Sequence, residues 1–169
     1  LTKILEQKNN LHELENIIVI CDGCTDNTEA IVKQLMKKDK RIKLYQDGKR
    51  LGKVSRLNQL FSIAKSKILV LIDADNMPKN NAVMDEMVKQ FNDKQIVLVG
   101  GHDTPVPANS FTEKVIVAGI HLWFEVRNKI QGKDNIHYIH ANIFAFHKKL
   151  YKKIIFPVNI VNDDNFAYL

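Results

Sequence analysis

The sequence has no apolar run long enough to cross a membrane. Apart from the apolar run at residues 68–72, its longest charge-free apolar stretch is Val115–Phe124, about half of the roughly 20 residues that a spanning helix needs. It also has no internal repeat, no low-complexity tract and no evident linker. We therefore predict one domain over residues 1–169, long enough to bury a core of its own.

Cysteine is scarce, with Cys21 and Cys24 as the only two. Their C-x-x-C spacing occurs in thioredoxin-like redox sites and in half of a zinc site. The intervening Asp22 and Gly23 are atypical of a thioredoxin-like helix start, and no second cysteine pair completes a zinc site. We predict two reduced thiols, as is typical of a reducing compartment.

Acidic residues are fewer than basic ones: the sequence has 19 Asp and Glu and 25 Lys and Arg, which gives a net charge of +6. Such an excess is compatible with a nucleotide, a nucleic acid or an acidic membrane surface. The basic residues are dispersed without interleaved aromatics, so we predict no nucleic-acid partner. No signal-peptide pattern opens the sequence. The predicted location is the cytoplasm, and attachment to the cytoplasmic face of a membrane through parts outside this sequence stays open.

What the sequence does contain is a regular alternation of apolar strand-length runs with helical periodicity. Strands are expected at residues 15–21, 41–46, 68–72 and 95–100, with helices between them. A long helix (111–130), a strand (136–146) and a short helix (148–155) follow. This alternation predicts an α/β fold with crossover helices on a mostly parallel sheet. The unbroken apolar run at residues 68–72 predicts a strand buried on both faces.

Two aspartates, Asp73 and Asp75, follow that run directly. Parallel sheets bind ligands beyond the carboxyl ends of their strands, so both carboxylates can face a ligand crevice. Two hard oxygen ligands suit Mg²⁺ or Mn²⁺ shared with substrate phosphates. Lys53 and Arg56, near the start of the preceding helix, add cations to backbone N–H groups and predict an anion site.

An Asp-x-Asp pair alone also fits ordinary strand-end carboxylates. An EF-hand loop counted from Asp73 would need Gly and Glu where the sequence has Pro78 and Met84, which excludes it. A phosphatase with an aspartyl nucleophile also places Asp-x-Asp after a buried strand. Thr or Val would then be expected soon after, where residues 76–78 are Asn-Met-Pro.

Four segments stand in a fixed order: residues 22–28 (Asp-Gly-Cys-Thr-Asp-Asn-Thr), 52–58 (Gly-Lys-Val-Ser-Arg-Leu-Asn), 73–75 (Asp-Ala-Asp) and 162–164 (Asn-Asp-Asp). Together they resemble the motifs of family 2 glycosyltransferases over nearly the whole chain. The resemblance implies the GT-A fold, a Rossmann-like three-layer αβα sandwich with a mostly parallel central sheet. It also implies inverting, metal-dependent transfer of a hexose from a nucleoside-diphosphate sugar, with a UDP-sugar as the predicted donor. The acceptor would be a hydroxyl of a glycan, a lipid-linked or another molecule.

The resemblance also implies roles for the donor-site residues. Asp22 matches the aspartate that binds the nucleobase, and Lys53 lies in the segment that faces the nucleotide. Arg56 is a weaker nucleotide candidate, for which a helix-surface or capping role stays open. Asp73 and Asp75 match the pair that holds the ribose and the divalent cation, Mn²⁺ or Mg²⁺, which stabilises the leaving nucleoside diphosphate.

Acceptor chemistry is assigned by the same resemblance. Asp164 matches the general base that deprotonates the acceptor hydroxyl. Asp163 stands where the family usually has Glu, so the choice between these neighbours stays open with Asp164 favoured, as does a helix N-cap role for both. His140 and Asn142 occupy the region near the acceptor and are predicted acceptor contacts, with a satisfied strand histidine as the alternative.

The sequence departs from the family pattern in three ways. Cys21 and Cys24 stand where the family has Asp and Ser, the family's opening strand has no counterpart, and its later acceptor-site elements have none after Leu169. We therefore expect a single catalytic domain truncated at both ends, with an unpaired sheet edge. The alternatives are a catalytically silent nucleotide- or carbohydrate-binding member and a sugar-nucleotide pyrophosphorylase-like nucleotidyltransferase.

Overall fold

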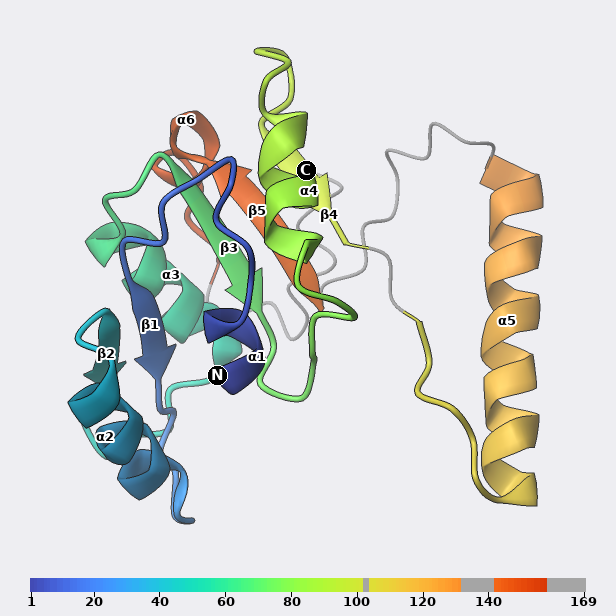
Figure 1. Ribbon diagram of the computed structural model, residues 1–169, viewed down its shortest axis with the longest axis horizontal. Coiled ribbons are helices and arrows are strands. Elements are labelled where there is room, and N and C mark those ends of the chain that lie inside the picture. The colour runs from blue at the N-terminus through green and yellow to red at the C-terminus, as the bar shows by residue number, and fades with distance from the viewer. Residues whose placement is uncertain (102–103, 132–141, 158–169) are drawn as a thin grey trace.

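The computed structural model describes residues 1–101, 104–131 and 142–157 (Figure 1). Helices and strands follow one another in the predicted order; α6 is shorter than predicted, and residues 136–141 of the predicted strand 136–146 lie outside the described residues. In chain order the elements are α1 (Thr2–Leu5), β1 (Ile17–Ile20), α2 (Thr28–Lys38), β2 (Ile42–Tyr45), α3 (Lys53–Ile63), β3 (Ile68–Ile72), α4 (Val83–Gln90), β4 (Leu98–Gly100), α5 (Phe111–Gln131), β5 (Ile143–His147) and α6 (Lys148–Tyr151).

The strands form two hydrogen-bonded groups. β1 pairs with β2 in parallel, with Ile17 opposite Ile42. β5 lies between β3 and β4 and is antiparallel to both, so β3 and β4 run in the same direction. The predicted α/β class with parallel strands is confirmed, and β5 is the strand that departs from parallel pairing.

Helices cover both faces of the β3–β5–β4 group. Phe61 of α3 packs on Phe146 of β5 with ring centroids 5.4 Å apart, within an apolar cluster that includes Tyr151 of α6. On the opposite face His147 lies 6.1 Å from Phe91, which follows α4. Because successive side chains of a strand point to opposite faces, α3 and α4 lie on opposite sides of this sheet. The layers are those of the predicted αβα sandwich.

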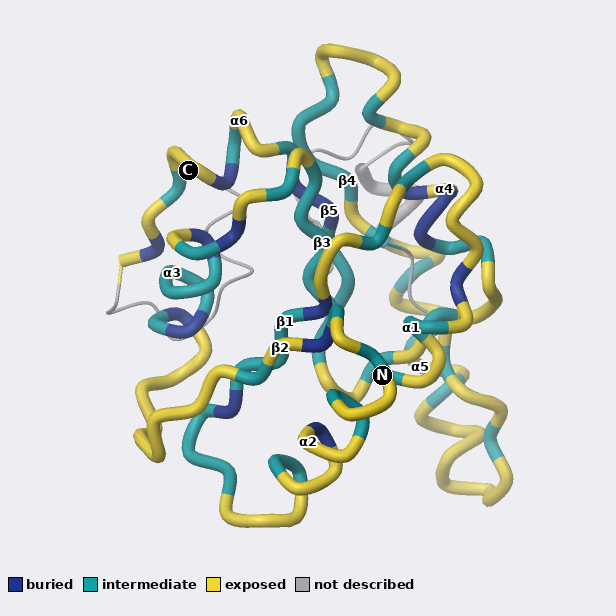
Figure 2. Tube along the Cα trace, turned by 60° about the vertical axis from the view of Figure 1, so that its left-hand side comes forward, coloured by how far each residue is buried: buried dark blue, intermediate teal, exposed yellow. Residues whose placement is uncertain are grey.

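The predicted burial of residues 68–72 on both faces is wrong. All five residues of β3 are only half-buried, as Figure 2 shows in teal along this strand. Among the described residues β3 pairs with β5 alone, so its second edge has no neighbouring strand. A run of branched apolar residues therefore predicted the strand correctly but not the open space beside it.

Residues 7–12, which we call the strap, lie in the connection between α1 and β1. Their hydrogen bonds attach this connection to the start of α4. Gln7 is buried, and its side chain donates to the Asn80 carbonyl at 2.7 Å and accepts from the Met84 N–H at 3.2 Å. The buried Asp85 lies 2.8 Å from His12 Nδ1 and accepts the N–H groups of residues 10 and 11. Burial acts to raise the pKa of Asp85, but these contacts outweigh it and lower the pKa.

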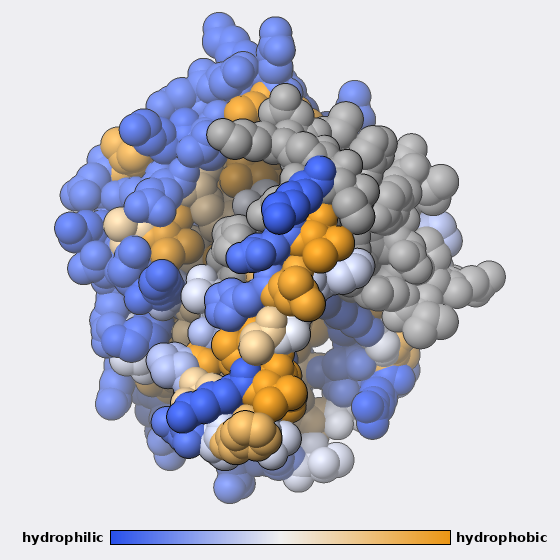
Figure 3. Space-filling view, turned by 90° about the vertical axis from the view of Figure 1, so that its right-hand side faces the viewer, coloured by the Kyte–Doolittle hydropathy of each residue, from blue (hydrophilic) through white to orange (hydrophobic). Residues whose placement is uncertain are grey.

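α5 lies to one side of the sheet layers, and part of its apolar surface is exposed (Figures 1 and 3). Phe111 is 82% exposed and Leu122 62% exposed. No helix among the described residues combines the length and apolar character needed to cross a bilayer.

The start of α6 is pH-sensitive. The His147 side chain accepts the Lys149 N–H at 3.1 Å and so caps the helix. Burial, and then the charges of Lys149 and Lys67, lower the pKa of His147 from its ordinary 6.5. The native state therefore binds protons less readily than the unfolded chain, and stability is expected to fall as the pH drops through 6.5 towards the lowered value.

Urea unfolding at about pH 7.5 and about pH 5.5 measures this loss. Asparagine accepts the same cap bond without titrating, so His147→Asn is expected to flatten the dependence in this range. An equally steep dependence in the variant would show that His147 is not its source.

Candidate functional site

The carboxyl ends of β1 and β3 meet the start of α3. Asp22, just after β1, accepts the Gly52 N–H at 2.9 Å through Oδ2, and Asp73, just after β3, accepts from Lys53 Nζ at 2.9 Å. Because residues 52 and 53 are neighbours, these bonds bring both strand ends to one edge. Three of the four sequence segments singled out above therefore converge there.

Asp22 holds the turn that leads into α3. Its Oδ1 accepts the Leu51 N–H at 2.7 Å and Arg56 Nε at 2.9 Å, in addition to the Gly52 bond. Burial acts to raise the pKa of Asp22, but the bonds from Leu51, Arg56 and Gly52 outweigh it and lower the pKa. Asp22 is thus a carboxylate with most of its acceptor positions filled, since two oxygens offer about four.

Glycine is required at the turn after β1. Gly23 has a φ of 68°, and a Cβ there would lie 3.1 Å from the Arg50 Cβ. Gly52, which precedes α3, has a φ of 85°. L-residues with a side chain rarely adopt such a φ, so both loops keep these shapes only with glycine. Gly23 also allows the close approach of its loop to Arg50, whereas Gly52 is required for its φ alone.

Arg56 is buried beneath these loops, 7% exposed. Its guanidinium binds both oxygens of Asp47, at 2.7 and 3.1 Å, and also reaches Asp22 and the Lys49 carbonyl. The pKa of Asp47 is lowered to about 2, chiefly by the hydrogen bonds from Arg56, and that of Arg56 is raised. Through these contacts Arg56 holds the loops around Asp22 in place.

Asp73 and Asp75 differ in their surroundings. The Asp73 side chain is 35% exposed and paired with Lys53, whereas Asp75 is exposed and accepts from the neighbouring Asn76 amide at 2.9 Å. Within the described part of the chain no group of three or more His, Cys, Asp and Glu side chains is arranged to hold a metal. Two carboxylates fit a cation whose remaining ligands are phosphate oxygens and water, as Mg²⁺ sites often are.

The acceptor-side predictions fall largely outside the described residues. His140, Asp163 and Asp164 all lie there. Asn142 is described, and its carbonyl accepts the Asp73 N–H at 3.1 Å. The structure therefore brings Asn142 next to the aspartate pair through its backbone.

Sequence reasoning missed Asp47. The Asp47-Gly48 pair signals a turn, and a turn aspartate gives no sign that a helix residue nine positions later will bind it. Arg56 is buried in the structure, and a buried arginine is almost always paired. Its burial was not evident from the sequence, which left a helix-surface position open.

The surroundings of Cys21 do not activate its thiol. Both thiols are free, as predicted, and Cys21 is buried. Burial, and then the neighbouring Cys24, raises the pKa of Cys21 to about 11. A reactive cysteine needs the opposite shift, because the thiolate is the nucleophile.

Comparisons with known proteins all point to glycosyltransferases. The profile of the family described as Glycosyl transferase family 2 matches residues 1–155. The chain is 28% identical over 86 residues to Glycosyltransferase GlyG of Streptococcus pneumoniae serotype 4. This match covers 51% of this chain and 28% of that protein. It is 39% identical over 59 residues to Glycosyltransferase AglD of Haloferax volcanii, covering 35% of this chain and 10% of that protein. The chain thus spans less than a third of the length of these relatives.

A solved structure has a similar fold. It is the mannosyltransferase PcManGT from Pyrobaculum calidifontis, in complex with GDP-Man and Mn²⁺. The TM-score is 0.76 at 20% identity, and the match covers 98% of this chain and 45% of that one. The likeness confirms the predicted GT-A fold.

Proposed function

This chain belongs to glycosyl transferase family 2, and from that premise we propose that it moves a sugar from a nucleoside-diphosphate sugar to an acceptor hydroxyl, with inversion and with a divalent cation. The observation that carries the proposal is the meeting of Asp22, Lys53 and Asp73 at the carboxyl ends of β1 and β3. Ligand crevices of α/β sheets lie at this edge.

The donor would lie across the two strand ends. Asp22 retains acceptor capacity for a nucleobase N–H, while its bonds to Leu51 and Gly52 keep the carboxylate fixed. Lys53 is the first residue of α3, where the helix N-terminus favours an anion. In the proposed complex the Lys53 ammonium contacts the diphosphate as well as Asp73. Arg56 orients Asp22 from below.

Asp73 and Asp75 would hold Mn²⁺ or Mg²⁺ together with the diphosphate oxygens. When bound, the cation supplies positive charge that stabilises the departing nucleoside diphosphate. The chain's part is to present the two carboxylates at the end of β3, where the Asp73 N–H donates to the Asn142 carbonyl just before β5.

Asp164 would take the proton of the acceptor hydroxyl, with Asp163 as the second candidate. In a single displacement with inversion, this base must lie on the face of the sugar opposite the leaving group. His140 and Asn142 are proposed to line the acceptor side. The acceptor is proposed to be a glycan, a lipid-linked molecule or another hydroxyl compound.

The proposed donor nucleotide is a uridine diphosphate. The structural neighbour contains GDP-Man, which makes a guanosine diphosphate the alternative to test. Thermal unfolding with a panel of nucleoside diphosphates, with and without Mn²⁺, separates the two. Stabilisation by GDP and metal without stabilisation by UDP would overturn the uridine assignment.

Asp75→Ala is expected to abolish the Mn²⁺-dependent part of that thermal shift. The substitution removes one of the two proposed protein ligands of the cation. In a site with so few protein ligands, this loss removes most of the affinity for Mn²⁺. Asp93→Asn is a matched control, because Asp93 precedes β4 and so lies at the opposite edge of the sheet. A metal-dependent shift that survives in Asp75→Ala would contradict the metal assignment.

A further inference from the structure

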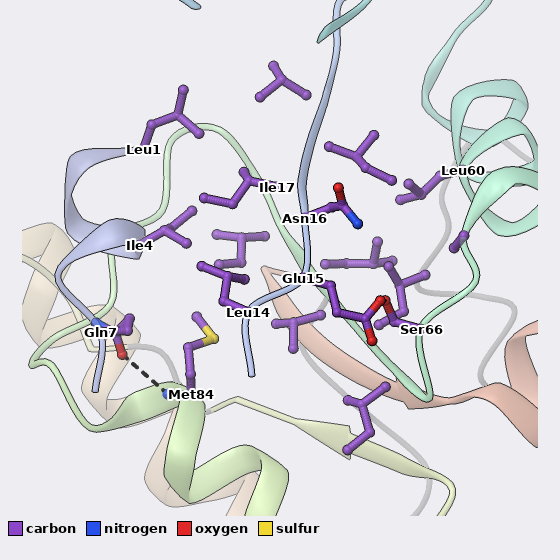
Figure 4. Close-up of a pocket in the computed structure, with 18 of the residues that line it drawn as sticks. Leu1, Ile4, Gln7, Leu14, Glu15, Asn16, Ile17, Leu60, Ser66 and Met84 are labelled. Atoms are coloured by element: carbon purple, nitrogen blue, oxygen red, sulfur yellow. Dashed lines mark hydrogen bonds between the residues drawn. The ribbon is translucent and has the colours of Figure 1, made fainter. Parts of the chain in front are cut away.

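Two apolar surfaces stand out in the molecule. One is a cavity of about 1020 Å³ beside β1 and β3, which Leu1, Leu60 and Met84 help to line (Figure 4). The other is the outer side of α5, and no residue of α5 lines that cavity. The cavity lies between secondary-structure elements, whereas the outer side of α5 is convex and open to solvent (Figure 3). Only the second is a surface that another molecule can cover without entering the fold.

The outer side of α5 carries six large apolar side chains, each 41% to 82% exposed. At about 100° per residue they fall within one arc of about 140° around the helix, which Figure 3 shows as an orange stripe. Val117, Ile120 and Phe124, on the remaining part of the helix, are half-buried. The six side chains therefore do not belong to the side that α5 turns towards the rest of the chain. We call them the α5 face: Phe111, Val115, Ile116, Leu122, Trp123 and Val126.

The α5 face is large for a monomer. A large side chain has roughly 150–250 Å² of surface, so the six present on the order of 600 Å² to solvent. The largest apolar patch of a typical soluble monomer is about 300–600 Å² and often marks an interaction site. Two such patches buried against each other would cover roughly 1,000–1,200 Å² in total, which reaches the lower bound of a specific interface.

Two exposed charges on one border of the α5 face indicate which partner fits it. Lys114 and Glu125 project from the same side of the helix but lie about 16 Å apart along it, too far to pair with each other. Among the described residues neither has an ion-pair partner. Helices that lie on a membrane surface carry mainly Lys and Arg beside their apolar side, which does not fit Glu125. Opposite charges on one border fit a second copy of the same face.

Antiparallel pairing of two copies satisfies both charges. Residues equally far from a two-fold axis, on opposite sides of it, face each other in such a pair. With the axis midway between Lys114 and Glu125, Lys114 faces the partner's Glu125, and the symmetry repeats this pair. The same axis sets Ile116 against the partner's Trp123. A parallel pair would instead place like charges at the same level, so the charges favour the antiparallel direction.

Gly119 lies next to this midpoint, within the arc of the α5 face. It has no positive φ, and no described atom beyond its own helix lies within 4 Å of where a Cβ would be. Glycine destabilises the middle of a helix relative to alanine, and neither a turn nor a close contact within the described chain accounts for it. At the crossing point of two helices, the missing side chain would let the backbones approach closely.

We propose that the α5 face is the interface of a homodimer, in which the α5 helices of two copies of this chain pair antiparallel about a two-fold axis next to Gly119. Lys129 lies on the same line of the helix as Phe111, so it would stand beside the partner's Phe111, whose ring attracts a cation. This inference concerns association of the chain and does not depend on the proposed activity.

Sedimentation of the chain at about 1–100 µM tests the proposal, and a monomer–dimer equilibrium is expected. Lys114→Glu and Glu125→Lys are each expected to raise the dissociation constant about tenfold or more, because each places like charges at both ends of the interface. The double variant exchanges the two charges and is expected to return to within about threefold of the unchanged chain. Only contact between antiparallel copies gives this recovery, since the two positions cannot meet within one helix.

Gly119→Leu separates association from folding. Leucine is the better helix former, so the helix content is expected to be kept or to rise while the dissociation constant rises about tenfold or more. His121→Leu is the matched control, because His121 is exposed on α5 outside the arc of the α5 face. Its dissociation constant is expected to stay unchanged.

A chain that stays monomeric over the whole concentration range would overturn the proposal. So would single charge variants that associate like the unchanged chain, a double variant as weak as the single ones, or unchanged association of Gly119→Leu. Binding of the monomer to vesicles of phosphatidylcholine and phosphatidylglycerol, without a dimer, would overturn it in favour of a lipid surface.

Discussion

Sugar transfer by Asp164→Asn is expected to be about 10²–10⁴-fold slower than by the unchanged protein at saturating donor, which is the usual contribution of a general base. Asparagine keeps the size of the side chain but cannot accept the hydroxyl proton. Donor affinity is expected to change little, because the donor is proposed to bind at the other end of the site. Initial rates of nucleoside diphosphate release, with an acceptor that supports turnover, measure the effect.

Asp163→Asn is the matched control for this experiment. A smaller loss in Asp163→Asn assigns the base to Asp164, and the reverse order would move the assignment to Asp163. Unchanged turnover in both variants would contradict a base in this segment. Release of pyrophosphate in place of nucleoside diphosphate would identify nucleotidyl transfer, and donor binding without turnover in the unchanged protein would identify a silent member.

Arg56→Ala is expected to lower the unfolding midpoint by about 5–10 °C, because removing one partner of a buried ion pair leaves the others uncompensated. Asp22 and Asp47 are 28% and 41% exposed, so water moderates the loss. Arg41→Ala is a matched control, since Arg41 binds Asp39 at 2.6 Å and its own side chain is 40% exposed, against 8% for Arg56. There the expected shift is a few degrees at most.

The acid limb of stability distinguishes this role from a purely packing role of Arg56. Asp47 has a pKa lowered from 3.8 to about 2, so the native state binds fewer protons than the unfolded chain. Its stabilisation is full above about 3.8 and is lost as the pH falls towards about 2. In Arg56→Ala this part of the acid limb is expected to flatten. An unchanged slope would show that the Arg56–Asp47 pair does not contribute to it.

Most of the fold could be predicted from the sequence, because local residue patterns determine where the strands and helices lie. Alternating apolar runs located β1 to β4, with helices between them. The antiparallel direction of β5 had no local signal, since direction depends on where the long connection through α5 returns. The predicted burial of β3 on both faces was wrong for a related reason: the residues of a strand do not show whether a neighbouring strand lies beside it.

The sequence predicted which residues belong to the site better than it predicted their hydrogen-bond partners. The motifs assigned Asp22, Lys53 and Asp73 to the donor site, and the structure brings them to one end of the strands. The same motifs gave Arg56 a nucleotide contact, whereas the structure shows it bound to Asp47 and Asp22. A shared motif position fixes where a residue lies, but its partners depend on residues that the motif does not include.

The strap also sets an order of events during synthesis. β1, α2 and β2 complete their contacts within one short stretch of chain, but Asp85 lies 73 residues beyond His12 and 75 beyond Asn10. Closing a longer loop costs more entropy, and the later partner must first leave the ribosome. The β1–β2 pair can therefore form before the strap has its partner. Docking of the strap on α4 is therefore expected to follow formation of the β1–β2 pair.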